Sequence, residues 1–253
     1  MQTFFHSRRS FIRKAALGTV AAFTIHETAT AATAGAKIKK LQPEKGYTVL
    51  FQGDSITDSG RDRENTGFNT ARNLGSGYAL LAGSVLLHKY ASMNLRVFNK
   101  GISGNKVFQL AERWDTDCLE MKPDILSILI GVNDIWHKLE GNYDGTAEVY
   151  KRDYIALIER TIKALPDLKL IICEPFAVPG VKAVDEKWYP EFYEYQKAAK
   201  EIALKFDTTF IPFQAVFDEA QKKAPGNWWT SDGVHPSLAG AQLMAEAWLS
   251  AFG

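Results

Sequence analysis

The chain has 253 residues, of which 46% are hydrophobic and 23% are charged, and its formal net charge is +1. This length suits one domain with a sizeable core, and the composition is that of a soluble globular protein. The near-neutral charge gives no reason to expect nucleic acid or an anionic membrane as a partner. The sequence contains no internal repeat and no apolar run long enough to span a bilayer.

The first 34 residues are expected to be a twin-arginine export signal with its cleavage region. The basic stretch "SRRSFIRK" contains the paired Arg8 and Arg9 and precedes a mildly apolar run over residues 15–25. Small residues then provide two sites for a signal peptidase, Ala29–Ala31 and Ala32–Ala34. We therefore expect a bacterial protein exported to the periplasm or secreted, with a single mature domain over residues 35–253 and no membrane insertion after processing. The alternatives are an ordinary secretory signal and a retained anchor without lipid.

Past residue 46, short apolar runs alternate with segments of helical period. Five of these runs have the length and composition of buried strands: Thr48–Phe51, Leu95–Asn99, Ile125–Ile130, Lys169–Cys173 and Thr209–Pro212. Strands separated by helices at this spacing predict βαβ units and a parallel sheet covered on both faces. The predicted fold class is therefore α/β, a three-layer α/β/α flavodoxin-like fold with a five-stranded parallel sheet.

Two of the helical patterns are long. Apolar residues recur at helical spacing over Tyr150–Leu165 and over Tyr195–Phe206, and Pro190 suits the first turn of the second of these helices. Ser237 is a suitable N-cap for a last helix that runs to about Leu249.

Polar motifs follow three of the predicted strands and precede the last predicted helix. Because the carboxyl ends of parallel strands meet at one edge of a sheet, where ligands collect, the first three motifs are expected to lie together. The fourth need only loop over that edge. The motifs are Gly53-Asp54-Ser55, "NKGISGN" (99–105), "IGVNDIW" (130–136) and "WWTSDGVHPS" (228–237).

Ser55, His235 and Asp232 are the residue types that acyl transfer requires. A serine hydroxyl is a poor nucleophile without a base within hydrogen-bond reach, and His235 is the only candidate in these loops. An imidazole needs a partner that fixes its tautomer and stabilises its cation, and Asp232 lies three residues earlier. The alternative for Ser55 is that it only caps the turn after the first strand.

Donors for the oxyanion of a tetrahedral intermediate are also available in these loops. The candidates are the backbone N–H groups of Ser55 and Gly104 and the side-chain amide of Asn133. Gly104 allows a backbone to approach a ligand closely as well as to turn. Gly101 is expected to serve only a tight turn that needs a positive φ.

In this order along the chain, Gly53-Asp54-Ser55, Gly104, Gly131-x-Asn133-Asp134 and Asp232-x-x-His235 resemble the four blocks of the SGNH (GDSL) hydrolases. The resemblance spans essentially the whole mature chain and implies serine-hydrolase chemistry, with Ser55 as nucleophile, His235 as base and Asp232 as its orienting acid. It also implies an oxyanion hole from Ser55, Gly104 and Asn133. The longer runs "LFQGDSITDSGR", "RWDTD" and "VHPSLAG" are similar to the bacterial acetyl-xylooligosaccharide esterases within that family.

Three residues in or beside the motifs are not expected to take part in the chemistry. Asp54 and Asp134 are expected to be structural carboxylates that accept hydrogen bonds from loop N–H groups. His137 is expected to lie in a surface turn, with a place in the substrate cleft as the alternative.

Three tryptophans in the site loops, Trp136, Trp228 and Trp229, could pack on the C–H faces of a sugar ring. We expect at least one of them to contact substrate. Burial in the core is the alternative for each of them.

Neither a metal nor a cofactor is expected. The sequence has no Cys/His cluster, no H-E-x-x-H motif and no G-x-G-x-x-G loop followed by an acidic residue. Cys118 and Cys173 both lie among apolar residues, which favours buried free thiols over a disulfide between them.

The expected function is that of an exported serine esterase that removes small acyl groups, acetyl foremost, from carbohydrate through an acyl-serine intermediate. Acetylated xylo-oligosaccharides are the expected substrates, so the partner is a small-molecule or oligosaccharide ester. The alternatives are a lipid-directed esterase or lysophospholipase of the same family, a serine peptidase, and a non-catalytic carbohydrate-binding protein on this scaffold. Whether copies of the chain associate into a homo-oligomer is left open by the sequence.

Overall fold

The computed structural model describes residues 40–253, which fold around one sheet of five parallel strands in the order β2-β1-β3-β4-β5. The expected export signal over residues 1–34 lies outside the described residues. The strands are β1 (Thr48–Gly53), β2 (Arg96–Asn99), β3 (Ile125–Leu129), β4 (Lys169–Cys173) and β5 (Thr209–Ile211). All five predicted strands are confirmed: β4 has the predicted bounds, and each of the other four differs by one or two residues at one end.

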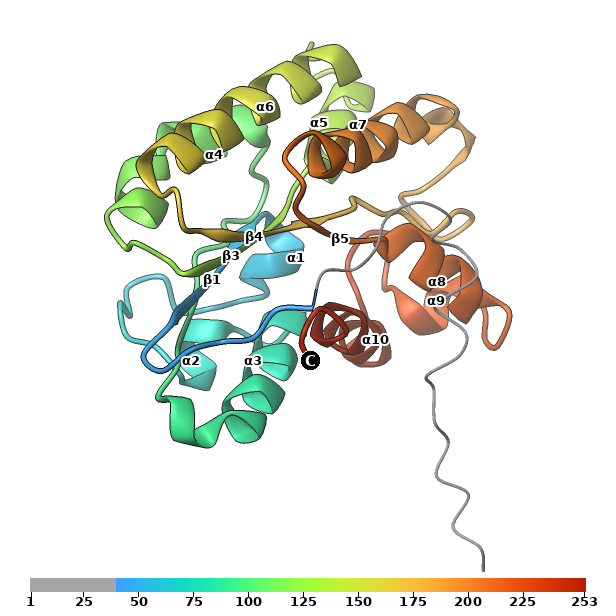
Figure 1. Cartoon of the computed structure of the whole chain (residues 1–253). Helices are drawn as coiled ribbons and strands as arrows, with labels where there is room; N and C mark the ends of the chain where they lie inside the picture. The colour runs from blue at the N-terminus through green and yellow to red at the C-terminus, as the bar shows by residue number, and fades with distance from the viewer. Residues whose placement is uncertain (1–39) are drawn as a thin grey trace, which may run out of the picture. The chain divides into compact units, whose positions relative to one another are not determined.

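Helices cover both faces of the sheet, so the predicted three-layer α/β/α fold is confirmed (Figure 1). On one face lie α2 (Ala71–Leu74), α3 (Tyr78–Lys89) and α10 (Leu238–Leu249), and on the other lie α4 (Val107–Glu112), α5 (Val132–Leu139), α6 (Ala147–Ala164) and α7 (Glu191–Lys205). The remaining helices are α1 (Ser55–Asp58), α8 (Phe213–Gln221) and α9 (Gly226–Trp229). Two 3-10 turns, η1 (Ala91–Met93) and η3 (Glu186–Trp188), and one π-helical turn, η2 (Asp115–Leu119), complete the described elements.

Local sequence explains where the long helices begin and which faces they bury. Helix α6 begins after Thr146, whose hydroxyl accepts a hydrogen bond from the backbone N–H of Val149, and its buried side chains recur at helical spacing. Helix α10 begins after the predicted N-cap, Ser237, and ends at Leu249 as expected. Pro190 lies at the N-cap of α7 and not inside its first turn as predicted.

Large aromatic side chains pack against both faces of the sheet, and the buried indoles of Trp248 and Trp114 keep their N–H groups paired. On one face the rings of Phe51 and Trp248 lie 4.7 Å apart, and the indole N–H of Trp248 donates to Ser127 Oγ at 2.9 Å. On the other face the indole of Trp114 donates to Thr161 Oγ1 at 2.8 Å. Burying these rings without an unpaired N–H stabilises the core.

Cys118 and Cys173 are buried free thiols, as expected from their apolar neighbours. Burial raises the pKa of each to about 12, so both thiols stay protonated and unreactive at neutral pH.

The strand order places a switch point between β1 and β3. The chain moves from β1 outward to β2 and then crosses back to β3, on the other side of β1. In doubly wound sheets, ligands bind beyond the carboxyl ends of the strands at this point. The motif with Ser55 follows β1 and the motif with Asn133 follows β3, so both border the expected crevice.

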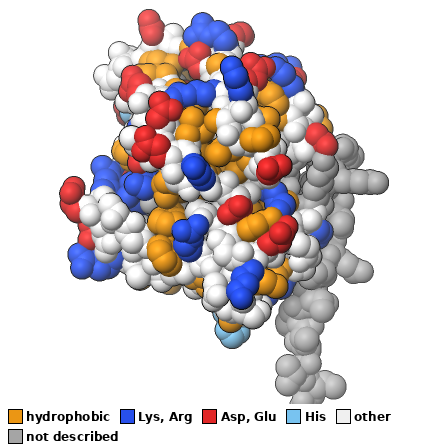
Figure 2. Space-filling model, turned by 60° about the vertical axis from the view of Figure 1, so that its left-hand side comes forward, with side chains coloured by type: hydrophobic (Ala, Val, Ile, Leu, Met, Phe, Trp, Pro, Cys, Tyr) orange, Lys and Arg blue, Asp and Glu red, His pale blue; other side chains and the backbone are white. Residues whose placement is uncertain are grey.

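The surface carries mixed charge. On the face shown in Figure 2, Lys and Arg side chains are interspersed with Asp and Glu, and hydrophobic side chains lie between them. Among residues 40–253, no helix has the length and apolar character needed to cross a membrane.

Candidate active site

Ser55 is the first residue of α1, immediately beyond the end of β1. The cap of this helix is Asp54, whose Oδ1 accepts a hydrogen bond from the backbone N–H of Ile56 at 3.0 Å. Ser55 is therefore not needed as a cap, and its backbone N–H, in the first turn, has no acceptor within the helix. At Gly53 the backbone passes so close to β3 that a side chain would collide with the carbonyl of Leu129, so this position requires glycine.

A continuous chain of hydrogen bonds joins Ser55, His235 and Asp232. Ser55 Oγ lies 2.8 Å from His235 Nε2, and His235 Nδ1 lies 2.7 Å from Asp232 Oδ2. With its proton on Nδ1, donated to the carboxylate, the imidazole presents the lone pair of Nε2 to the serine hydroxyl. This arrangement can remove the proton of Ser55 during attack on a carbonyl.

The loop around Asp232 explains why the acid lies three positions before the histidine in the chain. The other carboxylate oxygen, Oδ1, accepts the backbone N–H of His235 at 2.8 Å and that of Val234 at 2.9 Å. Partial burial favours the protonated acid, but these hydrogen bonds and the ring of His235 outweigh it and hold the pKa of Asp232 below its ordinary value. Asp232 is therefore ionised at neutral pH and can stabilise an imidazolium.

The three candidate oxyanion donors come from the ends of β1, β2 and β3. Gly104, in the loop after β2, has a φ of +82°, and only His137 lies near the space a side chain would take. Asn133 lies in the first turn of α5 and is 5% exposed. Its Nδ2 donates one hydrogen bond to the backbone oxygen of Asn105 at 3.2 Å. An amide nitrogen carries two hydrogens, so the second remains for an oxyanion.

The expectation for Gly101 was wrong. Its φ is not in the left-handed region, and a side chain there would collide with the backbone of Thr57 and Asp58 in α1. Gly101 is therefore needed for close packing of the loop after β2 against α1. No local pattern distinguishes this requirement from a tight turn.

The expectation for His137 was also wrong. The residue belongs to the last turn of α5 and is half-buried, with Nδ1 2.9 Å from Lys106 Nζ. Burial and the neighbouring Lys106 charge lower the pKa of His137, which favours the neutral imidazole. His137 Cε1 lies 4.0 Å from the position that a Cβ on Gly104 would take, so the imidazole lies beside the candidate oxyanion hole.

Asp54 and Asp134 accept backbone hydrogen bonds, as expected. The acceptor contacts are with Ile56 at 3.0 Å and Val107 at 3.4 Å. Burial raises the pKa of each carboxyl to about 7, and for Asp54 the nearby Asp134 adds to this effect. Both carboxyls therefore have a structural role at the edge of the site, where each accepts a hydrogen bond from a backbone N–H.

A cavity of about 300 Å³ lies beside the serine and histidine. The residues that line it include Ser59 and Ser76, which carry hydroxyls, and the exposed apolar Leu238. Neither Gly104 nor Asn133, the two donors from the other loops, lines it. The cavity therefore lies on the His235 side of the nucleophile.

The three tryptophans occupy different positions. The ring of Trp136 lies 6.0 Å from the ring of His235 and 5.7 Å from that of Trp188. Trp228 is 61% exposed, and the indole of Trp229 donates to the carbonyl of Ala224 at 3.1 Å. None of the three tryptophans lines the cavity beside Ser55.

A segment outside the four motifs, residues 178–189, supports the loop that carries the histidine. The backbone N–H of Val178 donates to the carbonyl of Gly233 at 2.7 Å, and that of Ala183 donates to the carbonyl of Asp232 at 3.0 Å. The buried Trp188 of this segment packs against Trp136. Sequence reasoning did not assign this support because the partners lie about fifty residues apart. Within the part of the chain that the structure describes, no three His, Cys, Asp or Glu side chains are grouped to hold a metal ion.

A Ser–His–Asp chain at the switch point of a parallel sheet is the arrangement of a serine hydrolase. The GDSL-like Lipase/Acylhydrolase family model matches residues 51–243. An acetylxylan esterase from Geobacillus stearothermophilus is 35% identical over 210 residues, which are 82% of this chain and 94% of that protein. The chain therefore belongs to the GDSL-like lipase/acylhydrolase family, as its motifs predicted, and is a carboxylic ester hydrolase.

Solved structures agree with this assignment. A Parabacteroides merdae protein assigned to the GDSL-like lipases is 49% identical, with a TM-score of 0.83 over 84% of this chain and 98% of that chain. The crystal structure of an acetylxylan esterase from Geobacillus stearothermophilus is 33% identical, with a TM-score of 0.75 over 84% of this chain and 97% of that chain.

Proposed function

We propose that this chain is an exported serine esterase that removes acetyl groups from acetylated xylo-oligosaccharides. The observation that supports it most is the hydrogen-bonded chain from Ser55 through His235 to Asp232. Similarity to acetylxylan esterases supports the choice of substrate.

The reaction proceeds in two halves. His235 Nε2 accepts the proton of Ser55 as Oγ attacks the ester carbonyl, and Asp232 stabilises the resulting imidazolium. The N–H groups of Ser55 and Gly104 and the amide of Asn133 hold the oxyanion. The sugar hydroxyl leaves with the proton from His235. Water, activated by the same imidazole, then releases acetate from the acyl-serine.

The cavity beside His235 suits the alcohol part of the substrate. The leaving oxygen must receive its proton from His235, so the alcohol lies on the side of the imidazole, where the cavity is. At about 300 Å³ the cavity is at the lower end of the range for small-molecule sites. Ser59 and Ser76 offer hydroxyls that can hydrogen-bond to a sugar, while the exposed Leu238 offers apolar surface.

The test compares substrates on the mature chain. Acetate release from acetylated xylo-oligosaccharides is measured beside hydrolysis of p-nitrophenyl acetate, butyrate and octanoate and of a lysophospholipid. We expect the acetylated oligosaccharide to have the highest kcat/KM and acetate to exceed octanoate. A preference for octanoate or lysophospholipid would instead make the chain a lipid-directed esterase. Binding of the oligosaccharide without turnover of any ester would make it a carbohydrate-binding protein.

Export is tested separately. The full chain is produced in a bacterium with twin-arginine and general secretory pathways, and the periplasm is assayed. We expect the mature chain there, and we expect replacement of Arg8 and Arg9 together by Lys to leave it in the cytoplasm. Export that survives this double substitution would indicate an ordinary secretory signal.

A further inference from the structure

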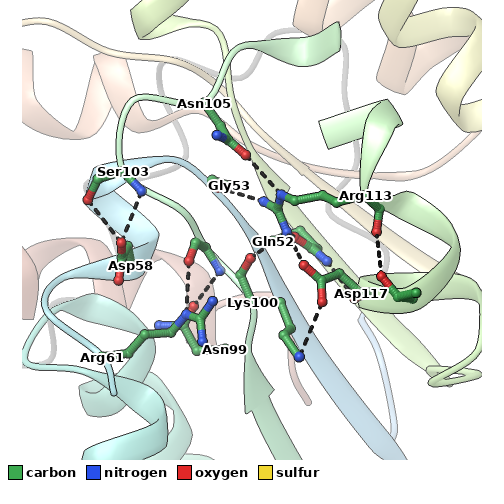
Figure 3. A network of polar contacts seen from close by, with 12 residues as sticks. Gln52, Gly53, Asp58, Arg61, Asn99, Lys100, Ser103, Asn105, Arg113 and Asp117 are labelled. Carbon is green, nitrogen blue, oxygen red and sulfur yellow. Dashed lines mark hydrogen bonds and ion pairs between the residues drawn. The ribbon is translucent and has the colours of Figure 1, made fainter. Parts of the chain in front are cut away.

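Arg113, at the C-terminal end of α4, bridges the loops that carry the proposed oxyanion donors (Figure 3). Its Nε donates to Asn105 Oδ1 at 2.8 Å, and its Nη1 donates to the carbonyl of Lys100 at 2.8 Å and to Gln52 Oε1 at 3.0 Å. Its Nη2 contacts the carbonyl of Gly53 at 3.4 Å. One guanidinium thus touches the end of β1 and both ends of the loop after β2.

The charge of Arg113 is balanced inside this network. Asp117 Oδ2 lies 2.9 Å from Arg113 Nη1, and Asp117 Oδ1 lies 3.2 Å from Lys100 Nζ. The backbone oxygen of Asp117 accepts a hydrogen bond from Gln52 Nε2 at 2.6 Å. Only 15% of the Arg113 side chain is exposed, so these contacts are largely shielded from water.

Each proposed oxyanion donor lies one short step from a contact of Arg113. Gly53 precedes Ser55 by two residues. Asn105 follows Gly104 directly, and its backbone oxygen accepts the hydrogen bond that orients the Asn133 amide. A guanidinium has five N–H donors in a fixed plane, whereas the ammonium of lysine is a compact point charge, so lysine cannot replace the fork.

We propose that Arg113 is a positioning residue of the oxyanion hole, which holds Ser55, Gly104 and Asn133 in register without touching substrate. This inference rests on the proposed function. Because the oxyanion forms only after attack on the carbonyl and is absent from bound substrate, displacement of its donors should lower kcat and leave KM nearly unchanged.

The test measures p-nitrophenyl acetate hydrolysis by Arg113→Lys and Arg113→Ala. We expect each to lower kcat by about 10–100-fold, since small displacements of reacting groups cost up to about 10²-fold, with KM within about threefold of wild type. Guanidinium ions at concentrations below those that unfold the protein should restore part of the kcat of Arg113→Ala. Arg160→Ala is the matched control, because Arg160 is a half-exposed arginine that contacts the same helix at the carbonyl of Ala111 but neither loop.

Asn105→Ala provides a second route if the Arg113 variants do not fold. It removes the side-chain oxygen that receives Arg113 Nε and leaves the backbone oxygen that holds Asn133. We expect about a tenfold loss of kcat, and in a folded Arg113→Ala background a much smaller further loss, because the two residues act through one contact. Full kcat in Asn105→Ala, or in a folded Arg113 variant, would overturn the inference.

Two further variants separate this inference from the proposed function. If Ser55→Ala and Asn133→Ala lose activity while the Arg113 and Asn105 variants keep it, only the inference fails. If Ser55→Ala and Asn133→Ala also keep activity, the proposed function fails with it.

Discussion

Asp232 holds His235 at two points, through the ring Nδ1 at 2.7 Å and through the backbone N–H at 2.8 Å. The first contact sets the tautomer of the imidazole, and the second fixes the position of the His235 backbone from which the ring extends. An amide at position 232 would keep the backbone contact and lose the ionic partner of the ring. We therefore expect Asp232→Asn to lower kcat roughly 10²–10⁴-fold without unfolding the loop.

This expectation is checked by steady-state hydrolysis of p-nitrophenyl acetate. Asp185→Asn is the control, because Asp185 caps η3 in the neighbouring segment, where its carboxylate accepts the N–H of Lys187. Activity of Asp232→Asn within tenfold of wild type would show that the carboxylate is not needed to orient the base.

Asn133→Ala should lower kcat by about 10²–10³-fold with little change in KM, as expected for the loss of one oxyanion donor. The near-complete burial of Asn133 makes some loss of stability expected too, so kcat is compared per folded molecule. Asn142→Ala, at an exposed position just past α5, is the control and should keep wild-type kcat. An increase in KM with unchanged kcat would assign Asn133 to substrate binding instead.

Trp136→Ala should raise KM for the oligosaccharide about tenfold, because its ring lies beside His235 at the site. Trp228→Ala should have no such effect, because Trp228 is 61% exposed and its ring, unlike that of Trp136, does not pack against His235. Trp136→Phe keeps an aromatic ring against Trp188 and serves to separate lost packing from lost substrate contact. Equal effects from Trp136→Ala and Trp228→Ala would contradict this assignment.

The buried Asp54 gives a prediction for stability against pH. Burial raises the pKa of its carboxyl from 3.8 to about 7, so the folded state holds a proton that the unfolded state has released above pH 4. The stability present below pH 4 is therefore lost as the pH rises to about 7. Asp54→Asn has no carboxyl to ionise at this position, so its free energy of unfolding should rise relative to that of wild type as the pH increases across this window. The gain should be at most about 4 kcal/mol and should not grow further above pH 8.

Urea unfolding at a series of pH values from 4 to 8 measures this difference. Asp185→Asn, at a more exposed carboxylate, should follow the wild-type curve. A difference between Asp54→Asn and wild type that stays flat across the window would mean that Asp54 is ionised throughout.

Gly101→Ala should destabilise the fold by about 1–3 kcal/mol, because the added methyl group would push the loop after β2 away from α1. The same two segments are joined by Asp58 Oδ2, which accepts hydrogen bonds from Ser103 N and Oγ at 3.0 and 2.9 Å. Ser84→Ala, at an exposed position on α3, should change stability by less than about 0.5 kcal/mol. Thermal unfolding compares the two, and equal midpoints would contradict the close approach.

The sheet could be predicted because its strands are encoded locally. Each strand is a short apolar run bounded by polar or helical segments, and the regular spacing of these runs leaves few topologies other than a parallel sheet. The positions of Ser55, Gly104 and Asn133 followed from this, since residues after parallel strands share an edge.

Features that depend on contacts between distant segments could not be predicted. Arg113 meets Gln52 and Gly53 from about sixty residues away, and nothing in its own neighbourhood indicates those partners. Gly101 was misassigned for the same reason, because it is constrained by the backbone of α1. His137 was misassigned for a local reason, because the helix that begins in its motif continues beyond it.

The claim that Ser55 is the nucleophile is tested most directly by kcat/KM of Ser55→Ala on p-nitrophenyl acetate, with circular dichroism to show that the variant is folded. We predict a fall of at least about 10⁴-fold relative to wild type, because the variant lacks the hydroxyl that is hydrogen-bonded to His235 Nε2. Activity of the folded variant within tenfold of wild type would contradict the assignment.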